Sequence, residues 1–148
     1  MERLTLHIGP GTFLPLRAER VEGHQMYPER VLLTPETADA LNRAREDGGR
    51  WCAVGTSTVR ALESACTRDG DARAMDGPTG LFIYPGHEFR SRIELLLTNF
   101  HLPRSTNLLL VCAYGGTQRV LDAYRQAVGL GYRFYTFGDA MLLEGGVG

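Results

Sequence analysis

The sequence predicts an α/β fold in which a mostly parallel or mixed sheet is flanked by helices. Short apolar runs typical of strands alternate along the chain with segments typical of helices. Polar loops follow four of the apolar runs, and ligands of α/β sheets bind beyond the ends of strands. The 148 residues contain no internal repeat and no linker, so residues 1–148 are predicted to form one domain with its own core.

Local signals place the first elements. Residues 4–8 alternate like a strand, and residues 30–33 form a second apolar run. A helix is predicted to begin at Pro35, because proline suits the first helical position and the oxygen of Thr34 can accept a free N–H group there. Glycines 48 and 49 end this helix.

The middle of the chain continues the alternation. Residues 51–54 are typical of a buried strand, and a helix follows that extends to residue 66. Residues 67–79 are charged and contain Gly and Pro, which predicts a surface loop. Residues 81–84 predict a further strand, closed by Pro85 and Gly86.

The last third predicts a strand at 93–97 and then two helices. Ser105 or Thr106 caps a helix over 107–114, and Thr117 caps the final one. One face of the final helix is predicted to pack on the core through its apolar residues, namely Val120, Leu121, Tyr124 and Val128. The aromatic-rich tail after residue 131 ends in a last strand.

Charge gives little guidance to a partner. Seventeen acidic and sixteen basic residues nearly cancel, so no overall field attracts nucleic acid or an anionic membrane. An RNA partner would need local basic patches. All sixteen of these basic residues are arginine, which suits bidentate phosphate contacts, although a codon bias gives the same excess. Candidate positions are Arg60, Arg90, Arg92, Arg104 and Arg119.

Cysteine usage and hydropathy predict a cytoplasmic protein. Cys52 and Cys112 lie inside apolar runs, which favours buried, reduced thiols, and the three cysteines form no C-x-x-C pair. No signal peptide is expected before the first strand, and no apolar stretch approaches the length of a membrane span.

Four loops hold the polar residues that could meet in one pocket: 7–12, 55–60, 84–87 and 98–101. Gly9 and Gly11 allow the backbone to approach a ligand, and Thr12 adds a hydroxyl, although so short a motif favours a plain turn. Thr56 and Ser57 stand where a helix begins, so free N–H groups beside hydroxyls suit a carboxylate or phosphate. Ordinary helix capping is the alternative.

Two further residues suggest acid–base chemistry. His101 could act as an acid or base near neutral pH, or stabilise its turn as a buried, hydrogen-bonded histidine. Asp139 could bind a ribose hydroxyl or an amine, or cap a turn. His24 and His87 lie in polar loops and are predicted to be solvated. The histidines are too scattered to suggest a metal site.

Five blocks, at residues 4–13, 55–64, 82–86, 97–106 and 132–142, resemble the S-adenosylmethionine:tRNA ribosyltransferase-isomerase family of queuosine biosynthesis. The first resembles that family's T-L-H-V-G-x-G-T-F, and the second its G-T-T-x-V-R-x-L-E-S. The third is Phe-Ile-Tyr-Pro-Gly, and the fourth begins Leu-Thr-Asn-Phe-His-Leu-Pro-Arg. The fifth contains Phe-Gly-Asp-Ala-Met-Leu. The blocks occur in the family's order and cover most of the chain.

The resemblance implies an α/β barrel-like fold and an unusual reaction. S-adenosylmethionine is a substrate that donates its ribosyl group to the aminomethyl group of 7-aminomethyl-7-deazaguanine in tRNA, and epoxyqueuosine forms as adenine and methionine leave. No separate cofactor is expected. On this reading His101 is the preferred acid or base, followed by His7 and Asp139, while Thr56, Ser57 and Arg60 contact a carboxylate or phosphate. The other predicted substrate-binding residues are Gly9, Gly11, Thr12, Tyr84, Asn99 and Ser105.

Members of the resembled family are more than twice as long. An N-terminal segment and an inserted β-rich domain have no counterpart here, so the chain should hold only part of the barrel-like domain. We therefore expect exposed sheet edges and apolar surface, covered in a homo-oligomer or by a complementing half. The alternatives are a truncated relative with a small-molecule acceptor, and a non-catalytic fragment that binds S-adenosylmethionine or a partner.

Overall fold

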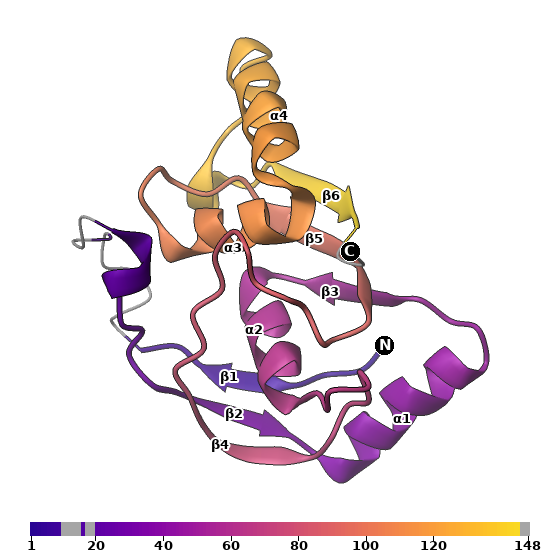
Figure 1. Cartoon of the computed structure of the whole chain (residues 1–148). Helices are drawn as coiled ribbons and strands as arrows, with labels where there is room; N and C mark the ends of the chain where they lie inside the picture. Colours follow the sequence, from indigo (N-terminus) through magenta and orange to yellow (C-terminus); the bar gives the residue numbers. More distant parts are fainter. Residues whose placement is uncertain (10–15, 17–19, 146–148) are drawn as a thin grey trace.

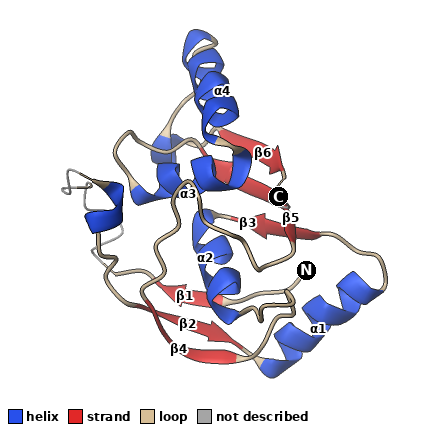
Figure 2. Cartoon of the chain, in the orientation of Figure 1, coloured by secondary structure: helices blue, strands red, loops and turns tan. Residues whose placement is uncertain are grey.

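The computed structural model describes residues 1–9, 16 and 20–145, and these form two small sheets with helices around them (Figures 1 and 2). The first sheet has the order β1-β2-β4, with bounds Thr5–His7, Glu29–Leu33 and Met75–Thr79. The second has the order β3-β5-β6, with bounds Trp51–Val54, Ile93–Asn99 and Ala140–Glu144. The helices are α1 (Pro35–Glu46), α2 (Thr56–Ala65), α3 (Thr106–Gly115) and α4 (Thr117–Gly129), with 3-10 turns η2 (Val21–Gly23) and η3 (Tyr135–Phe137).

The α/β prediction is confirmed, but the sheet arrangement differs from it. In the described part of the chain, the only parallel pair is β3 with β5; β6 runs antiparallel to β5, and the first sheet is antiparallel throughout. The second sheet is therefore mixed rather than mostly parallel, and the described strands close no barrel.

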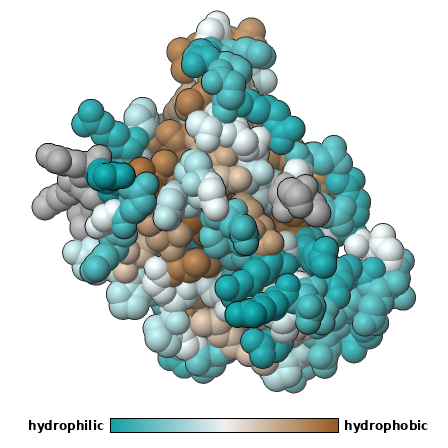
Figure 3. Space-filling view, in the orientation of Figure 1, coloured by the Kyte–Doolittle hydropathy of each residue, from teal (hydrophilic) through white to brown (hydrophobic). Residues whose placement is uncertain are grey.

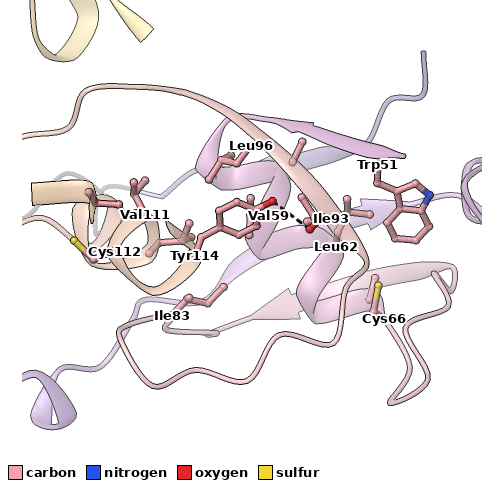
Figure 4. Close-up of a cluster of buried hydrophobic side chains, with 14 of the residues drawn as sticks. Trp51, Val59, Leu62, Cys66, Ile83, Ile93, Leu96, Val111, Cys112 and Tyr114 are labelled. Carbon is pink, nitrogen blue, oxygen red and sulfur yellow. Dashed lines mark hydrogen bonds between the residues drawn. The ribbon is translucent and has the colours of Figure 1, made fainter. Parts of the chain in front are cut away.

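Helix α2 packs between the two sheets and contacts strands of both (Figure 1). Val59 and Leu62 of α2 lie in a core with Leu96 of β5 and Val111 of α3, all at most 4 % exposed (Figure 4). The hydroxyl of Tyr114 donates to the Ile93 carbonyl at 3.1 Å, which joins the end of α3 to the start of β5. The core therefore depends on α2 as its central element.

Local signals located several elements correctly. The side chain of Thr34 accepts from the Thr37 N–H at 3.3 Å, and α1 begins at Pro35 as predicted. Ser105 caps α3 by accepting from the Leu108 N–H at 3.2 Å. Helix α4 begins at Thr117, but its N-cap residue is Gly116 and no side chain caps it, so the predicted role of Thr117 is wrong.

Two predictions for residues 67–84 are wrong for the same reason. Residues 75–79 were expected in a loop but form β4, because the backbone of β2 supplies their hydrogen bonds; β4 is an edge strand and so tolerates Pro78. Residues 81–84 were expected to form a strand but pair with none. Ile83 is nonetheless only 2 % exposed, so this apolar run contributes to the core from a loop.

Two predicted buried positions are exposed. Cys52 lies on the open face of β3, whereas Cys112 is buried as predicted. Val128 is 67 % exposed near the end of α4, and Ala127 is buried in its place. Helix α4 projects away from the sheets, with hydrophilic residues along much of it and hydrophobic colour at its tip, while hydrophilic residues also cover α1 (Figures 1 and 3).

One face of the second sheet is open. Val54, Leu97 and Leu142 are adjacent on β3, β5 and β6 and are 65 %, 39 % and 61 % exposed. Sheets that contain parallel strands are usually covered on both faces. The expected exposure of apolar surface is therefore present. Among the described helices, none combines the length and the apolar character needed to cross a lipid bilayer.

Candidate functional site

The ends of β3 and β5 bring two of the predicted loops together. Because these strands are parallel, their carboxyl ends lie at one edge of the second sheet, and the Gly55 N–H donates to the Leu97 carbonyl at 2.8 Å. The hydroxyl of Thr56 donates to the side-chain oxygen of Asn107 on α3 at 3.1 Å. Thr56 is buried and Ser57 half-buried at the start of α2.

Asn99 and Asp139 meet at the same edge. The Asn99 amide donates to the Asp139 carbonyl at 3.2 Å, since β6 begins beside the end of β5. The Asp139 carboxylate accepts from the N–H of Arg133 and, at 3.4 Å, from its guanidinium. The backbone bond and then the side-chain bond from Arg133 lower the pKa of Asp139, so this carboxylate is ionised at neutral pH. Its side chain is 29 % exposed and a solute can reach it.

His101 is buried directly behind this edge. Its Nε2 lies 3.0 Å from the Thr98 hydroxyl, and its backbone N–H donates to the Tyr124 hydroxyl at 2.8 Å. Burial lowers the pKa of the imidazole to about 4, so His101 is neutral at physiological pH. A neutral imidazole can accept a proton, and the same contacts also hold the turn after β5.

Ser105 lies beyond this turn, and its hydroxyl acts as donor and as acceptor within the same segment of the chain. Its hydroxyl donates to the Leu102 carbonyl at 2.7 Å while it caps α3. The structure therefore gives Ser105 a clear capping contact, and its predicted contact with substrate stays a prediction.

A second group surrounds a buried ion pair on the other side of α2. Glu29 of β2 accepts from the Arg60 guanidinium at 2.5 Å and from the Gly9 N–H at 2.9 Å. The side chains of Arg60 and Glu29 are 5 % and 1 % exposed. Arg60 also donates to the Leu81 carbonyl at 3.2 Å, and its Nη2 has no partner among the described residues. The carboxylate that Arg60 binds here is thus one of the protein's own.

The remaining predicted residues lie apart from these two groups. His7 is exposed on β1, opposite Arg30 of β2. Tyr84 packs against Phe82 with ring centroids 5.2 Å apart, in a loop and not at a strand end. Gly11 and Thr12 lie outside the described residues. The four predicted loops therefore do not share one pocket in the described part of the structure.

Two histidines predicted to be solvated are partly buried. The ring of His24 packs edge-on against Phe82, with centroids 4.9 Å apart. His87 lies 3.3 Å from the Glu63 carboxylate with a side chain 20 % exposed. His87 is half-buried because its loop lies against Glu63 of α2, and His24 because Phe82 packs against its ring.

Sequence reasoning missed Glu29, Glu63 and Asn107. Glu29 had a readable signal, since it stands two residues before Val31 and therefore on the face that β2 buries. Glu63 accepts from the N–H groups of Arg90 and Ser91 at 2.7 and 2.9 Å. No local signal indicates that contact, because the partners are far along the chain.

Acid should destabilise the fold through His101. In the unfolded chain the His101 imidazole has a pKa of 6.5, and in the folded chain burial lowers this pKa to about 4. Between these pH values the unfolded imidazole binds a proton and the folded one does not. Stability is therefore complete above pH 6.5 and falls as the pH decreases toward 4, by up to about 3 kcal/mol. Urea unfolding across this range measures the effect. His101→Gln should flatten the dependence and His7→Gln should leave it in place; an unchanged profile in His101→Gln contradicts the assignment.

Comparison with known proteins identifies the family. The sequence model described as "Queuosine biosynthesis protein" matches residues 1–143. An S-adenosylmethionine:tRNA ribosyltransferase-isomerase of Gluconacetobacter diazotrophicus is 56 % identical over 141 residues, which are 95 % of this chain and 39 % of that protein. One from an Anaeromyxobacter species is 58 % identical over 140 residues, 95 % of this chain and 40 % of that protein.

A solved structure agrees. The S-adenosylmethionine tRNA ribosyltransferase of Thermotoga maritima is 50 % identical, with a TM-score of 0.70 over 77 % of this chain and 40 % of that one. The chain thus spans about 40 % of the length of the relatives that it matches. It belongs to the queuosine biosynthesis protein family, whose curated relatives are the S-adenosylmethionine:tRNA ribosyltransferase-isomerases.

Proposed function

We propose that this chain takes part in transferring and isomerising the ribosyl group of S-adenosylmethionine onto 7-aminomethyl-7-deazaguanine in tRNA. Epoxyqueuosine is the product, and adenine and methionine are released. The observation that carries the proposal is the 56 % identity over 141 residues with a relative named for S-adenosylmethionine:tRNA ribosyl transfer. S-adenosylmethionine is a substrate in this reaction, and no separate cofactor is proposed.

The reaction needs a base, an acid and a neutral acceptor amine. The sulfonium acidifies the neighbouring ribose carbon, so a base can remove a proton there, and an acid assists the departure of adenine. His101 is the proposed acid or base, because its imidazole lies at the turn after β5, beside Asn99, with Nε2 against the Thr98 hydroxyl. Asp139 is proposed to hold the cationic sulfonium or to accept a hydrogen bond from the neutral amine, because it is ionised and reachable. His7 lies on the other sheet, so a role for it requires a substrate that reaches both sheets.

Binding groups flank these residues. We assign the methionine carboxylate to the start of α2, where Thr56 and Ser57 stand beside free N–H groups. Asn99 lies next to Asp139 and can bind a ribose hydroxyl. Arg60 can offer only its unpartnered Nη2, since Glu29 and the Leu81 carbonyl take its other contacts. Gly9, Gly11, Thr12, Tyr84 and Ser105 remain proposed contacts of the same substrates.

Adenine release from S-adenosylmethionine tests the proposal. The purified chain is incubated with and without tRNA that carries the deazaguanine precursor, and adenine is measured. Release that depends on tRNA supports the proposed reaction. Release without tRNA points to a small-molecule acceptor, and bound S-adenosylmethionine without release identifies a binding fragment. If the purified chain is active and the His101→Gln variant releases adenine at the same rate, the acid–base role of His101 is overturned.

Asp139→Asn should lower adenine release by about ten- to a hundredfold, because it removes one charge-assisted contact to a cationic substrate. Asp122→Asn is the matched control, since Asp122 is a carboxylate on α4 that pairs with Arg125 away from this edge. Both variants are compared by initial rate and by melting temperature. Equal rates in the two variants contradict the role of Asp139, and equal melting temperatures exclude a folding defect as the cause.

A second candidate is a non-catalytic fragment that binds S-adenosylmethionine or a partner chain. The open apolar face at Val54, Leu97 and Leu142 favours it, together with the 39–40 % coverage of the relatives. A complementing polypeptide or a second copy could cover this face. Sedimentation of the purified chain, alone and mixed with the remaining part of a relative, distinguishes these states.

A further inference from the structure

A large groove lies at the opposite end of β5 from Asn99 and His101. It has a volume of about 1390 Å³ and is bounded by the loop over 87–92, the junction of α3 and α4, and the end of β6. The proposed substrate contacts do not line it. The groove therefore has no role in the proposed ribosyl transfer.

Four arginines from three segments line this groove: Arg68, Arg90, Arg92 and Arg119. None of them forms an ion pair with a carboxylate of the described residues, whereas seven other arginines do. Arg119 donates to the Gly115 and Glu144 carbonyls, and Arg92 to the Asp69 carbonyl, so these two are positioned without being neutralised. Two glutamates, Glu88 and Glu144, also line the groove, and Glu144 pairs with Arg50. Positive charge therefore predominates.

Aromatic rings stand among these charges. Phe89 packs edge-on against His87 and against Tyr114, with centroids 4.9 and 5.7 Å apart, and all three residues line the groove. The Glu63 carboxylate holds the loop through the N–H groups of Arg90 and Ser91, so the groove wall is fixed. These rings pack on one another and Tyr114 is only 4 % exposed, so they shape the wall and leave the arginines as the groups that can contact a ligand. Four arginines without ion pairs among the described residues suit a chain of phosphates, and the size of the groove exceeds that of a single phosphate.

We propose that this groove binds the phosphodiester backbone of structured RNA, away from the nucleotide that reacts. The proposal rests on the proposed function, in which tRNA is the acceptor. The guanidinium groups contact phosphates and release counterions from the RNA, so binding is independent of the base that is modified and depends strongly on salt.

Binding of a fluorescently labelled, unmodified tRNA transcript tests the inference by anisotropy over a series of salt concentrations. Arg68→Gln/Arg90→Gln is the groove variant, because both side chains are exposed and neither forms a hydrogen bond or ion pair among the described residues. Arg43→Gln/Arg73→Gln is the charge-matched control, with two exposed arginines outside the groove. The groove variant should bind about tenfold more weakly at low salt, with a slope of log Kd against log salt smaller by about one to two. The control should bind as the original chain does.

Two results would overturn the inference. Equal weakening by both variants shows that RNA responds only to net charge. Displacement of the RNA by inorganic pyrophosphate at equimolar concentration shows that the groove takes a compact anion. The outcome is separable from that of the proposed function, because the transcript lacks the deazaguanine and adenine release is measured independently. RNA binding that depends on the groove, without adenine release, supports the groove and counts against the proposed reaction. Adenine release without groove-dependent RNA binding supports the reaction and counts against the groove.

Discussion

Replacing Arg60 with alanine should lower the free energy of unfolding by about 3–5 kcal/mol, because the Glu29 carboxylate would be left buried without its guanidinium. The Glu29 side chain is 1 % exposed and its Oε2 lies 2.5 Å from Nη1 of Arg60. The pair joins β2 to α2, the helix between the two sheets. Losing it therefore acts on the centre of the fold.

Urea unfolding followed by Trp51 fluorescence measures this effect, since the protein's one tryptophan is 4 % exposed in the core. Arg43→Ala is the control: Arg43 is exposed on α1 and should change stability by no more than about 0.5 kcal/mol. Equal loss in the two variants would show that the pair does not hold the fold. Replacing both partners with methionine should recover much of the loss, because no unpaired charge then remains buried.

Glu63→Ala should lower the free energy of unfolding by about 2–4 kcal/mol and release the loop over 87–92. The Glu63 carboxylate is 2 % exposed and accepts from two backbone N–H groups, so its removal leaves the Arg90 and Ser91 donors without a partner. Hydrogen exchange of these two amides should accelerate far more than exchange within α1.

Glu88→Ala provides the control in the same loop, because Glu88 is exposed and accepts no bond that the structure describes. Its unfolding free energy and its Arg90 and Ser91 exchange should stay unchanged. Protection of the Ser91 amide that persists in Glu63→Ala would refute the clamp. If Glu63→Ala keeps the secondary structure of the original chain but binds RNA more weakly, that result also agrees with a groove wall that Glu63 holds in place.

The stretch over 55–64 carries both of these residues. Its resemblance to a family motif suggested substrate contacts, and Arg60 was predicted to be one. In the structure Arg60 and Glu63 hold the protein's own backbone and side chains. Residues of a family motif can therefore stabilise the fold instead of contacting substrate. The proposed ligand contacts of this stretch are Thr56 and Ser57 at the start of α2.

Short-range interactions explain what could be read directly from the sequence. The start of α1 depends on Thr34 and Pro35, and the start of α3 on Ser105, each within three residues of the group it serves. The apolar runs of β3 and β5 belong to the same class, whereas the contact of Asn99 with Asp139 joins residues 40 positions apart. The family itself was identifiable, because five blocks retain their order over the whole chain.

Tertiary contacts decided the rest. Residues 75–79 have poor strand propensity and become β4 only because β2 lies beside them, while the better run at 81–84 finds no partner strand. The burial of His101 and the pairing of Glu29 with Arg60 likewise depend on elements distant in sequence. The sequence by itself determined the starts of α1 and α3, the strand runs of β3 and β5, and the family. Which strands pair and which polar groups are buried was decided only by tertiary structure, because those free energies arise between residues that local patterns do not connect.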